Sequence, residues 1–145
     1  MKVAILTSKL LTNSAAYELN SLLREFRPDS EPPNIRQWRG IIAQKEVRLF
    51  TVRENGKIVG MAILRWHDLP MGRVGTLEDV VVARGHQGKG YGSELTVAII
   101  DFAKKQKMAY IDLTTRPQRK VANHLYQKFG WEKRKTNVYR LILKK

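Results

Sequence analysis

A glycine-rich segment that follows a run of valines constrains the fold of this chain most strongly. The segment Arg84 to Gly92 holds four of the ten glycines in the sequence. It comes directly after Val80-Val81-Val82, a continuous apolar run that is typical of a buried strand. The residues after it have the spacing of an amphipathic helix, with apolar positions at Leu95, Ala98, Ile99, Phe102 and Ala103. The sequence therefore predicts a strand, a tight turn and a helix in succession, which is a unit of α/β folds.

The other patterns predict a mixed α/β domain. Asn55-Gly56 separates two β-rich runs, 47–52 and 57–66, and predicts a tight hairpin. Thr12-Asn13-Ser14 predicts the N-terminal cap of a helix that ends before Pro28. Further helices are expected over 35–44 and 119–129, and further strands over 3–7, 73–83, 110–114, 131–134 and 138–143. We expect one domain over residues 1–145, with a central, buried strand at 73–83 and about four helices beside the sheet.

Composition excludes several classes of protein. Hydrophobic residues make up 43% of the chain and charged residues 28%, which argues against wholesale disorder. The chain has no cysteine, so it has no disulfide, thiolate nucleophile, iron–sulfur cluster or cysteine-ligated zinc. His67, His86 and His124 lack metal-ligand spacing. We therefore expect no metal cofactor.

The sequence also gives an expectation about location. No apolar run approaches the roughly 18–20 residues that a membrane span needs. The apolar part of the first seven residues is too short for a signal peptide. We expect a cytoplasmic protein that does not cross a membrane.

Positive charge is concentrated in the last third of the chain. The chain has 27 Lys or Arg against 13 Asp or Glu, a formal net charge of +14, and residues 101–145 carry 13 of the basic and 3 of the acidic side chains. Such a surface attracts polyanions: nucleic acid, an anionic membrane or a phosphorylated small molecule. Charge alone does not choose among them.

The glycine-rich turn predicts a site for phosphate. Glycine permits positive φ and close approach to the backbone, and a turn before a helix can present free N–H groups at the positive end of its dipole. Neither Gly85 nor Gly88 continues as a P-loop, and Gly88-x-Gly90-x-Gly92 has the wrong final gap for a dinucleotide fingerprint. The alternative is that the glycines only make a tight turn.

Two motifs resemble those of one superfamily. Gln87-Gly88-Lys89-Gly90-Tyr91-Gly92, preceded by 77–82, resembles the acetyl-CoA motif Gln/Arg-x-x-Gly-x-Gly/Ala of the GCN5-related N-acetyltransferases (GNAT). The segment 122–131 resembles a second family motif, with Asn123 three residues before Tyr126. The resemblance runs from about 75 to 131 and implies a mixed, mostly antiparallel sheet with splayed central strands.

The resemblance also implies roles for residues. The residues implied to hold the pyrophosphate of coenzyme A are Gln87, Gly88, Lys89, Gly90, Tyr91 and Gly92. Those implied to pair with the pantetheine arm, like a neighbouring strand, are Val80, Val81 and Val82. Asn123 would contact the cofactor. Tyr126 would protonate the leaving thiolate, unless it is only a core aromatic.

The general base and the acceptor stay open. Glu78 and Asp79 should point to opposite faces of a strand, and Glu78 is the candidate base, unless it is structural or solvated. Where other family members have a base, on the next strand, this chain has Thr114. The expected activity is acetyl transfer from acetyl-CoA to a primary amine, and a homodimer is compatible with it. The alternatives are an amino-sugar-phosphate acetyltransferase and a non-catalytic, basic nucleic-acid-binding module.

Overall fold

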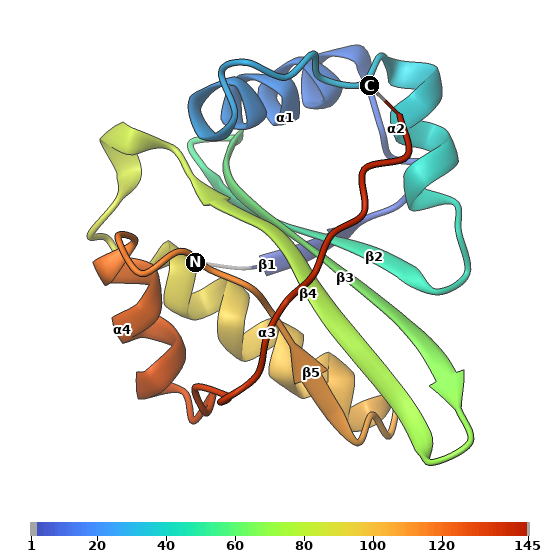
Figure 1. Ribbon diagram of the computed structural model, residues 1–145. Coiled ribbons are helices and arrows are strands. Elements are labelled where there is room, and N and C mark those ends of the chain that lie inside the picture. The colour runs from blue at the N-terminus through green and yellow to red at the C-terminus, as the bar shows by residue number, and fades with distance from the viewer. Residues whose placement is uncertain (1–2, 145) are drawn as a thin grey trace. The chain divides into compact units, whose positions relative to one another are not determined.

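The structure of the protein is a computed structural model that describes residues 3–144 (Figure 1). The expectations for residues 1, 2 and 145 lie outside the described residues. The chain divides into two units, Met1–Thr114 and Thr115–Lys145.

The first unit contains a five-stranded sheet in which the strands lie side by side in chain order. The strands are β1 (Val3–Leu6), β2 (Val47–Glu54), β3 (Lys57–Leu69), β4 (Gly72–Val82) and β5 (Tyr110–Asp112). The pairs from β1 to β4 are antiparallel, and β5 alone runs parallel to its neighbour β4. The prediction of a mixed, mostly antiparallel sheet is confirmed.

Helices lie on both faces of this sheet. The helices of the first unit are α1 (Asn13–Phe26), α2 (Ile35–Ile42), the short 3₁₀ helix η1 (Arg84–His86) and α3 (Tyr91–Lys105). Figure 1 shows α1 and α2 on one face and α3 on the other. The second unit contains one helix, α4 (Lys120–Lys128). The described residues thus hold the four α-helices that the sequence predicts.

Local sequence signals explain where these elements begin and turn. Asn55 and Gly56 have φ values of 49° and 81°, which fits the two left-handed positions of a type I′ hairpin turn between β2 and β3. The hydroxyl of Thr12 accepts a hydrogen bond of 3.1 Å from the amide of Ala15. Thr12 is therefore the N-cap of α1, as its position before the helix predicts.

Alternate residues of the strands build two cores, one on each face. Leu49 is fully buried in the cluster under α1 and α2, whereas the ring of the next residue, Phe50, packs edge-on against Phe102 of α3 at 5.7 Å. Trp38 is buried in α2, where its indole N–H donates to the side-chain oxygen of Asn20 at 2.7 Å. Both cores are thus filled by large side chains that alternate along the strands.

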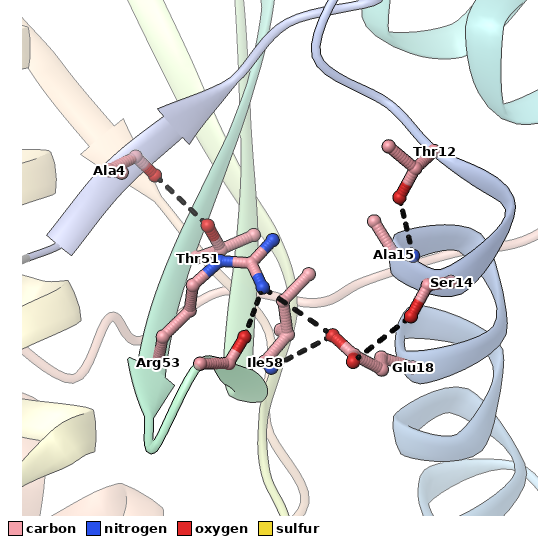
Figure 2. Close-up of polar contacts among 9 residues, drawn as sticks. Ala4, Thr12, Ser14, Ala15, Glu18, Thr51, Arg53 and Ile58 are labelled. Carbon is pink, nitrogen blue, oxygen red and sulfur yellow. Dashed lines mark hydrogen bonds and ion pairs between the residues drawn. The ribbon is translucent and has the colours of Figure 1, made fainter.

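The carboxylate of Glu18 fastens α1 to the β2–β3 hairpin, as Figure 2 shows. Its Oε2 accepts a hydrogen bond from the amide of Ile58 at 3.0 Å and lies 3.6 Å from the guanidinium of Arg53. Arg53 also donates to the carbonyl of Gly56 at 2.6 Å, within the turn. The side chain of Glu18 therefore connects α1 to β2 and β3 and fixes the position of α1 beside the hairpin.

Two sequence predictions about strands are wrong. Residues 131–134 and 138–143 form no strand; the structure has irregular backbone throughout 131–144. A strand needs backbone hydrogen bonds to a neighbour, which β-branched and aromatic residues cannot supply by themselves. The end of β4 is also less buried than expected, because Val80 and Val82 are half-buried and only Val81 is buried.

Candidate active site

The edge of β4 that faces β5 is paired over only part of its length. Val74, Gly75 and Thr76 pair with the three residues of β5. No strand of the described residues continues this pairing along 77–82. The two strands therefore separate beside the carboxyl-terminal half of β4, and they leave backbone positions there that an extended ligand can pair with. The residues predicted to pair with pantetheine, Val80 to Val82, lie on this stretch.

A β-bulge interrupts the same half of β4. The register passes from Ile63↔Glu78 to Met61↔Val81, so two residues of β4 lie opposite one residue of β3. Asp79, the first of the two, has a left-handed φ of 47°. Bulges bend a strand and redirect its side chains. The regular alternation that we assumed for Glu78 and Asp79 does not hold here.

Glu78 and Asp79 each contact a different cation. Glu78 Oε1 lies 3.4 Å from the Nε of Arg65 on β3, and 40% of its side chain is exposed. Asp79 Oδ1 lies 3.1 Å from an Nη of Arg27, just after α1. The two carboxylates are therefore not a catalytic pair, and water reaches Glu78.

The glycine-rich loop has the backbone conformation that its composition predicts. Gly88 and Gly90 have φ values of 77° and 90°. A Cβ built on either residue, or on Gly85, meets no atom within 4 Å. Gly90 is the N-cap of α3 and supplies no side chain to the helix's first amides. Gln87 folds back, and its side-chain amide donates to the carbonyl of Val82 at 3.1 Å. The loop thus has open space above an uncapped helix terminus.

One carboxylate that sequence reasoning missed contacts this loop. Glu54, at the end of β2, accepts a hydrogen bond of 2.6 Å from the hydroxyl of Tyr91 and one of 3.1 Å from the ammonium of Lys89. Its other oxygen lies 2.9 Å from His86 Nε2. The hydrogen bonds from Tyr91 and Lys89 lower the pKa of Glu54. The bond to Glu54, with burial, raises the pKa of Tyr91 to about 12, so its hydroxyl keeps its proton at neutral pH.

The second unit carries the two remaining predicted site residues, both on α4. The side-chain amide of Asn123 donates to the carbonyls of Arg116 and Arg119, at 3.0 and 2.9 Å. It thereby holds the turn before the helix. The ring of Tyr126 packs edge-on against Trp131, with centroids 5.7 Å apart. Burial raises the pKa of Tyr126, against a smaller opposing effect of Arg119.

Two tryptophans belong to the cores. Trp38 is 1% exposed and packs with α1. Trp66 is 8% exposed, its ring lies 5.5 Å from that of Phe102, and the guanidinium of Arg48 lies over it at 5.2 Å. Their burial explains why the sequence places large aromatics at these positions.

The described residues hold neither a metal-binding cluster nor a membrane-spanning helix. Within residues 3–144, no cluster of three or more His, Cys, Asp or Glu side chains has an arrangement that could hold a metal ion. None of the helices in this part of the chain is both long enough and apolar enough to span a membrane.

Comparison with known proteins identifies the family. The model of the acetyltransferase (GNAT) family matches residues 13–131. A mycothiol acetyltransferase from Renibacterium salmoninarum is 34% identical over 85 residues, which cover 57% of this chain and 25% of that protein. This chain thus matches about a quarter of the length of that curated relative.

Solved structures share the fold at low sequence identity. An aminoglycoside acetyltransferase from an uncultured soil metagenomic sample has a TM-score of 0.84 and 16% identity, covering 97% of this chain and 95% of that one. A ribosomal-protein-alanine N-acetyltransferase from Brucella melitensis has a TM-score of 0.78 and 19% identity, covering 99% of each chain. The family match covers most of the sequence. The chain therefore belongs to the GNAT family of acetyltransferases, enzymes that take acetyl-CoA as a substrate.

Proposed function

We propose that the protein transfers the acetyl group of acetyl-CoA to a primary amine by direct attack, without an acetylated enzyme intermediate. The observation that carries this proposal is the unpaired edge of β4, which leads into a glycine loop and an uncapped helix. An extended thioester arm suits the edge, and the phosphates at its other end suit the helix N-terminus. The family match runs across the boundary at Thr114, which supports treating the chain as one acetyltransferase domain.

The loop from Gln87 to Gly92 is the proposed pyrophosphate site. Its left-handed glycines turn the backbone, and Cβ atoms there would meet nothing within 4 Å, so a bulky anion has room to approach. The uncapped amides at the start of α3 add the positive end of a helix dipole. Because Lys89 is hydrogen-bonded to Glu54, we assign the binding to backbone N–H groups more than to this side chain.

Val80 to Val82 are the proposed partners of the pantetheine arm. They lie on the half of β4 beside which residues 3–144 place no strand on the β5 side. The carbonyl of Val82 is already bonded to the side chain of Gln87. The backbone N–H groups near Val82 are then the groups we propose to polarise the thioester carbonyl.

The proposed reaction needs a base and an acid. The amine nitrogen attacks the thioester carbon, and a base takes a proton from the attacking nitrogen. When the tetrahedral intermediate collapses, the carbon–sulfur bond breaks and the thiolate takes a proton. We propose Glu78 as the base, acting through water, because its side chain is partly exposed and one oxygen is engaged by Arg65.

Tyr126 is the proposed acid. Burial raises the pKa of Tyr126, so its phenol stays protonated at neutral pH and can donate to a thiolate whose conjugate acid has a pKa near 8.5. Asn123 lies one helical turn earlier on α4, and we propose that its side-chain oxygen accepts a hydrogen bond from the cofactor.

The proposed acceptor class is a primary amine, which covers several chemistries. The names of the relatives concern mycothiol, aminoglycosides and ribosomal-protein alanine. An amino-sugar phosphate is the alternative acceptor, because its anionic group would suit a chain of net charge +14.

Binding of acetyl-CoA is the first test. Calorimetry should give a one-to-one complex, and a rise in melting temperature should accompany it. A thiol-release screen over amino sugars, polyamines, aminoglycosides and peptide N-termini should then identify the acceptor. Gly90→Ala should weaken acetyl-CoA binding and serves as the site control. Absence of binding and of any thermal shift in the wild-type protein would overturn the proposal.

A further inference from the structure

The loop proposed to hold phosphate contains one anionic contact that its function does not explain. Glu54 contacts side chains from three parts of the same segment: η1, the glycine turn and the first turn of α3. A carboxylate beside a phosphate site repels the ligand, so its presence there needs a compensating effect.

The geometry fits a carboxylate that fixes the loop. The hydroxyl of Tyr91 is the closest donor, at 2.6 Å, and Tyr91 is itself 2% exposed, so this end of the contact is rigid. From this fixed point the carboxylate reaches Lys89, which lies between the two left-handed glycines, and also His86 at the end of η1. Because Nε2 of His86 faces the carboxylate, the proton of a neutral ring lies on that nitrogen.

Without these contacts the loop would be free to sample other conformations. Gly88 and Gly90 have space around them and few steric limits on their backbone. Beside the backbone hydrogen bonds of η1, two side-chain hydrogen bonds hold this part of the segment: Glu25 accepts from the amide of Arg84 at 2.9 Å, and Gln87 donates to the carbonyl of Val82. Both lie before Gly88. Glu54 is the side chain that holds the half of the loop from Lys89 to Tyr91.

We infer that Glu54 is a positioning residue that holds the phosphate loop in its binding conformation and so sets the affinity for the pyrophosphate-bearing part of acetyl-CoA. This inference rests on the proposed function of the loop. Two effects of Glu54 oppose each other. The negative charge of Glu54 weakens anion binding, but the ammonium of Lys89, 3.1 Å away, neutralises it. In exposed surroundings at physiological salt, the remaining charge effect raises the Kd for acetyl-CoA about twofold. Ordering a glycine loop in advance has a larger effect, about tenfold.

The test compares Glu54→Ala and Glu54→Gln with the wild-type protein. We expect Glu54→Ala to raise the calorimetric Kd for acetyl-CoA about tenfold, and Glu54→Gln about threefold, since its amide oxygen can still accept from Tyr91. Amide hydrogen exchange at residues 88–92 should be faster than in the wild-type protein in both variants, and it should be faster in Glu54→Ala than in Glu54→Gln. Glu46→Ala is the matched control, because Glu46 is an exposed carboxylate just before the other end of β2.

A truncated donor separates positioning from general damage. Acetyl-pantetheine lacks the pyrophosphate, so thiol release from it should stay within about twofold of wild type in both Glu54 variants. Should Glu54→Ala not fold, Glu54→Gln carries the same comparison.

Three results would count against the inference. Acetyl-CoA binding by Glu54→Ala that equals or exceeds wild type overturns it while leaving the proposed function intact. Equal losses with acetyl-CoA and acetyl-pantetheine assign Glu54 a merely structural role. If the wild-type protein does not bind acetyl-CoA at all, the proposed function fails and the inference fails with it.

Discussion

Tyr126 is the residue on which the proposed proton transfer to sulfur depends. Its hydroxyl is the group that Tyr126→Phe removes, while the ring that packs against Trp131 is kept. We expect kcat to fall about 100- to 10,000-fold, the usual contribution of a positioned acid, with the Kd for acetyl-CoA changed less than twofold. Thiol-release kinetics and calorimetry measure the two quantities. Tyr110→Phe, on the exposed face of β5, is the matched control.

The same residue gives a pH prediction. An acid catalyst is active below its pKa, and burial moves the pKa of Tyr126 above its usual value of 10.0. Rates at pH 7–9 should therefore not fall through loss of this proton. They should rise instead, as the amine acceptor loses its own proton. A pH–rate profile checks this, and a decrease near pH 8 that disappears in Tyr126→Phe would contradict the assignment.

At the scale of elements, the glycine-rich loop can be tested by substitutions at two of its glycines. Gly90 has a φ of 90° and Gly85 does not have a positive φ, yet a Cβ has open space at both. Gly90→Ala should therefore destabilise the fold by about 1–3 kcal/mol through backbone strain alone, and weaken acetyl-CoA binding. Gly85→Ala should be nearly neutral in both respects. Urea denaturation and calorimetry measure the pair, and equal effects would exclude strain as the cause.

The attachment of α1 to the β2–β3 hairpin makes a second prediction at this scale. Glu18→Ala leaves the buried amide of Ile58 without its acceptor, which should cost about 1–2 kcal/mol of the free energy of unfolding. Glu18→Gln keeps an oxygen acceptor and should cost less. The hydrogen bond from Ser14 to Glu18 is long, at 3.5 Å, so Ser14→Ala should change stability by less than about 0.5 kcal/mol. Urea denaturation measures all three; similar losses in Ser14→Ala and Glu18→Ala would contradict this account.

Elements set by local chemistry were the ones that the sequence predicted. Asn55-Gly56 and the cap at Thr12 are decided by residues within a few positions, and both are as expected. The bulge at Asp79 was missed, since it depends on register with β3. The tail strands at 131–134 and 138–143 were wrong because pairing depends on a neighbour that propensity does not provide.

The candidate site divides in the same way. The glycines of the loop favour a left-handed backbone conformation because they lack a Cβ, so the conformation of Gly88 and Gly90 could be predicted from the sequence. Glu54 lies more than thirty positions before the loop residues that it contacts, and nothing about a glutamate at the end of a strand indicates them. Its contacts form only when α3 packs against the sheet to which β2 belongs.

At the scale of the whole molecule, the salt dependence of ligand binding distinguishes an acetyltransferase from a nucleic-acid-binding protein. Residues 115–145 carry ten Lys or Arg and one Glu, and duplex DNA would bind such a segment with strong salt dependence. We expect the thermal shift caused by acetyl-CoA to persist at about 300 mM salt, while binding to random DNA falls by several orders of magnitude between about 50 and 300 mM. Thermal shift and fluorescence anisotropy make the comparison. Salt-resistant DNA binding with no acetyl-CoA shift would favour the nucleic-acid-binding alternative.

The sheet order also determines how the first unit reaches its folded state. β2, β3 and β4 are joined by short turns, so they can pair at little cost in loop-closure entropy. The connection from β4 to β5 contains the whole of α3, so this pairing closes a longer loop, and β5 contributes only three residue pairs. We therefore expect the rate-limiting step of folding to be set by the β2–β3–β4 meander. Substitutions in β5 should then mainly speed unfolding and leave the folding rate unchanged. The extent of β5, and with it the part of β4 that β5 leaves unpaired, can therefore change without lowering the folding rate.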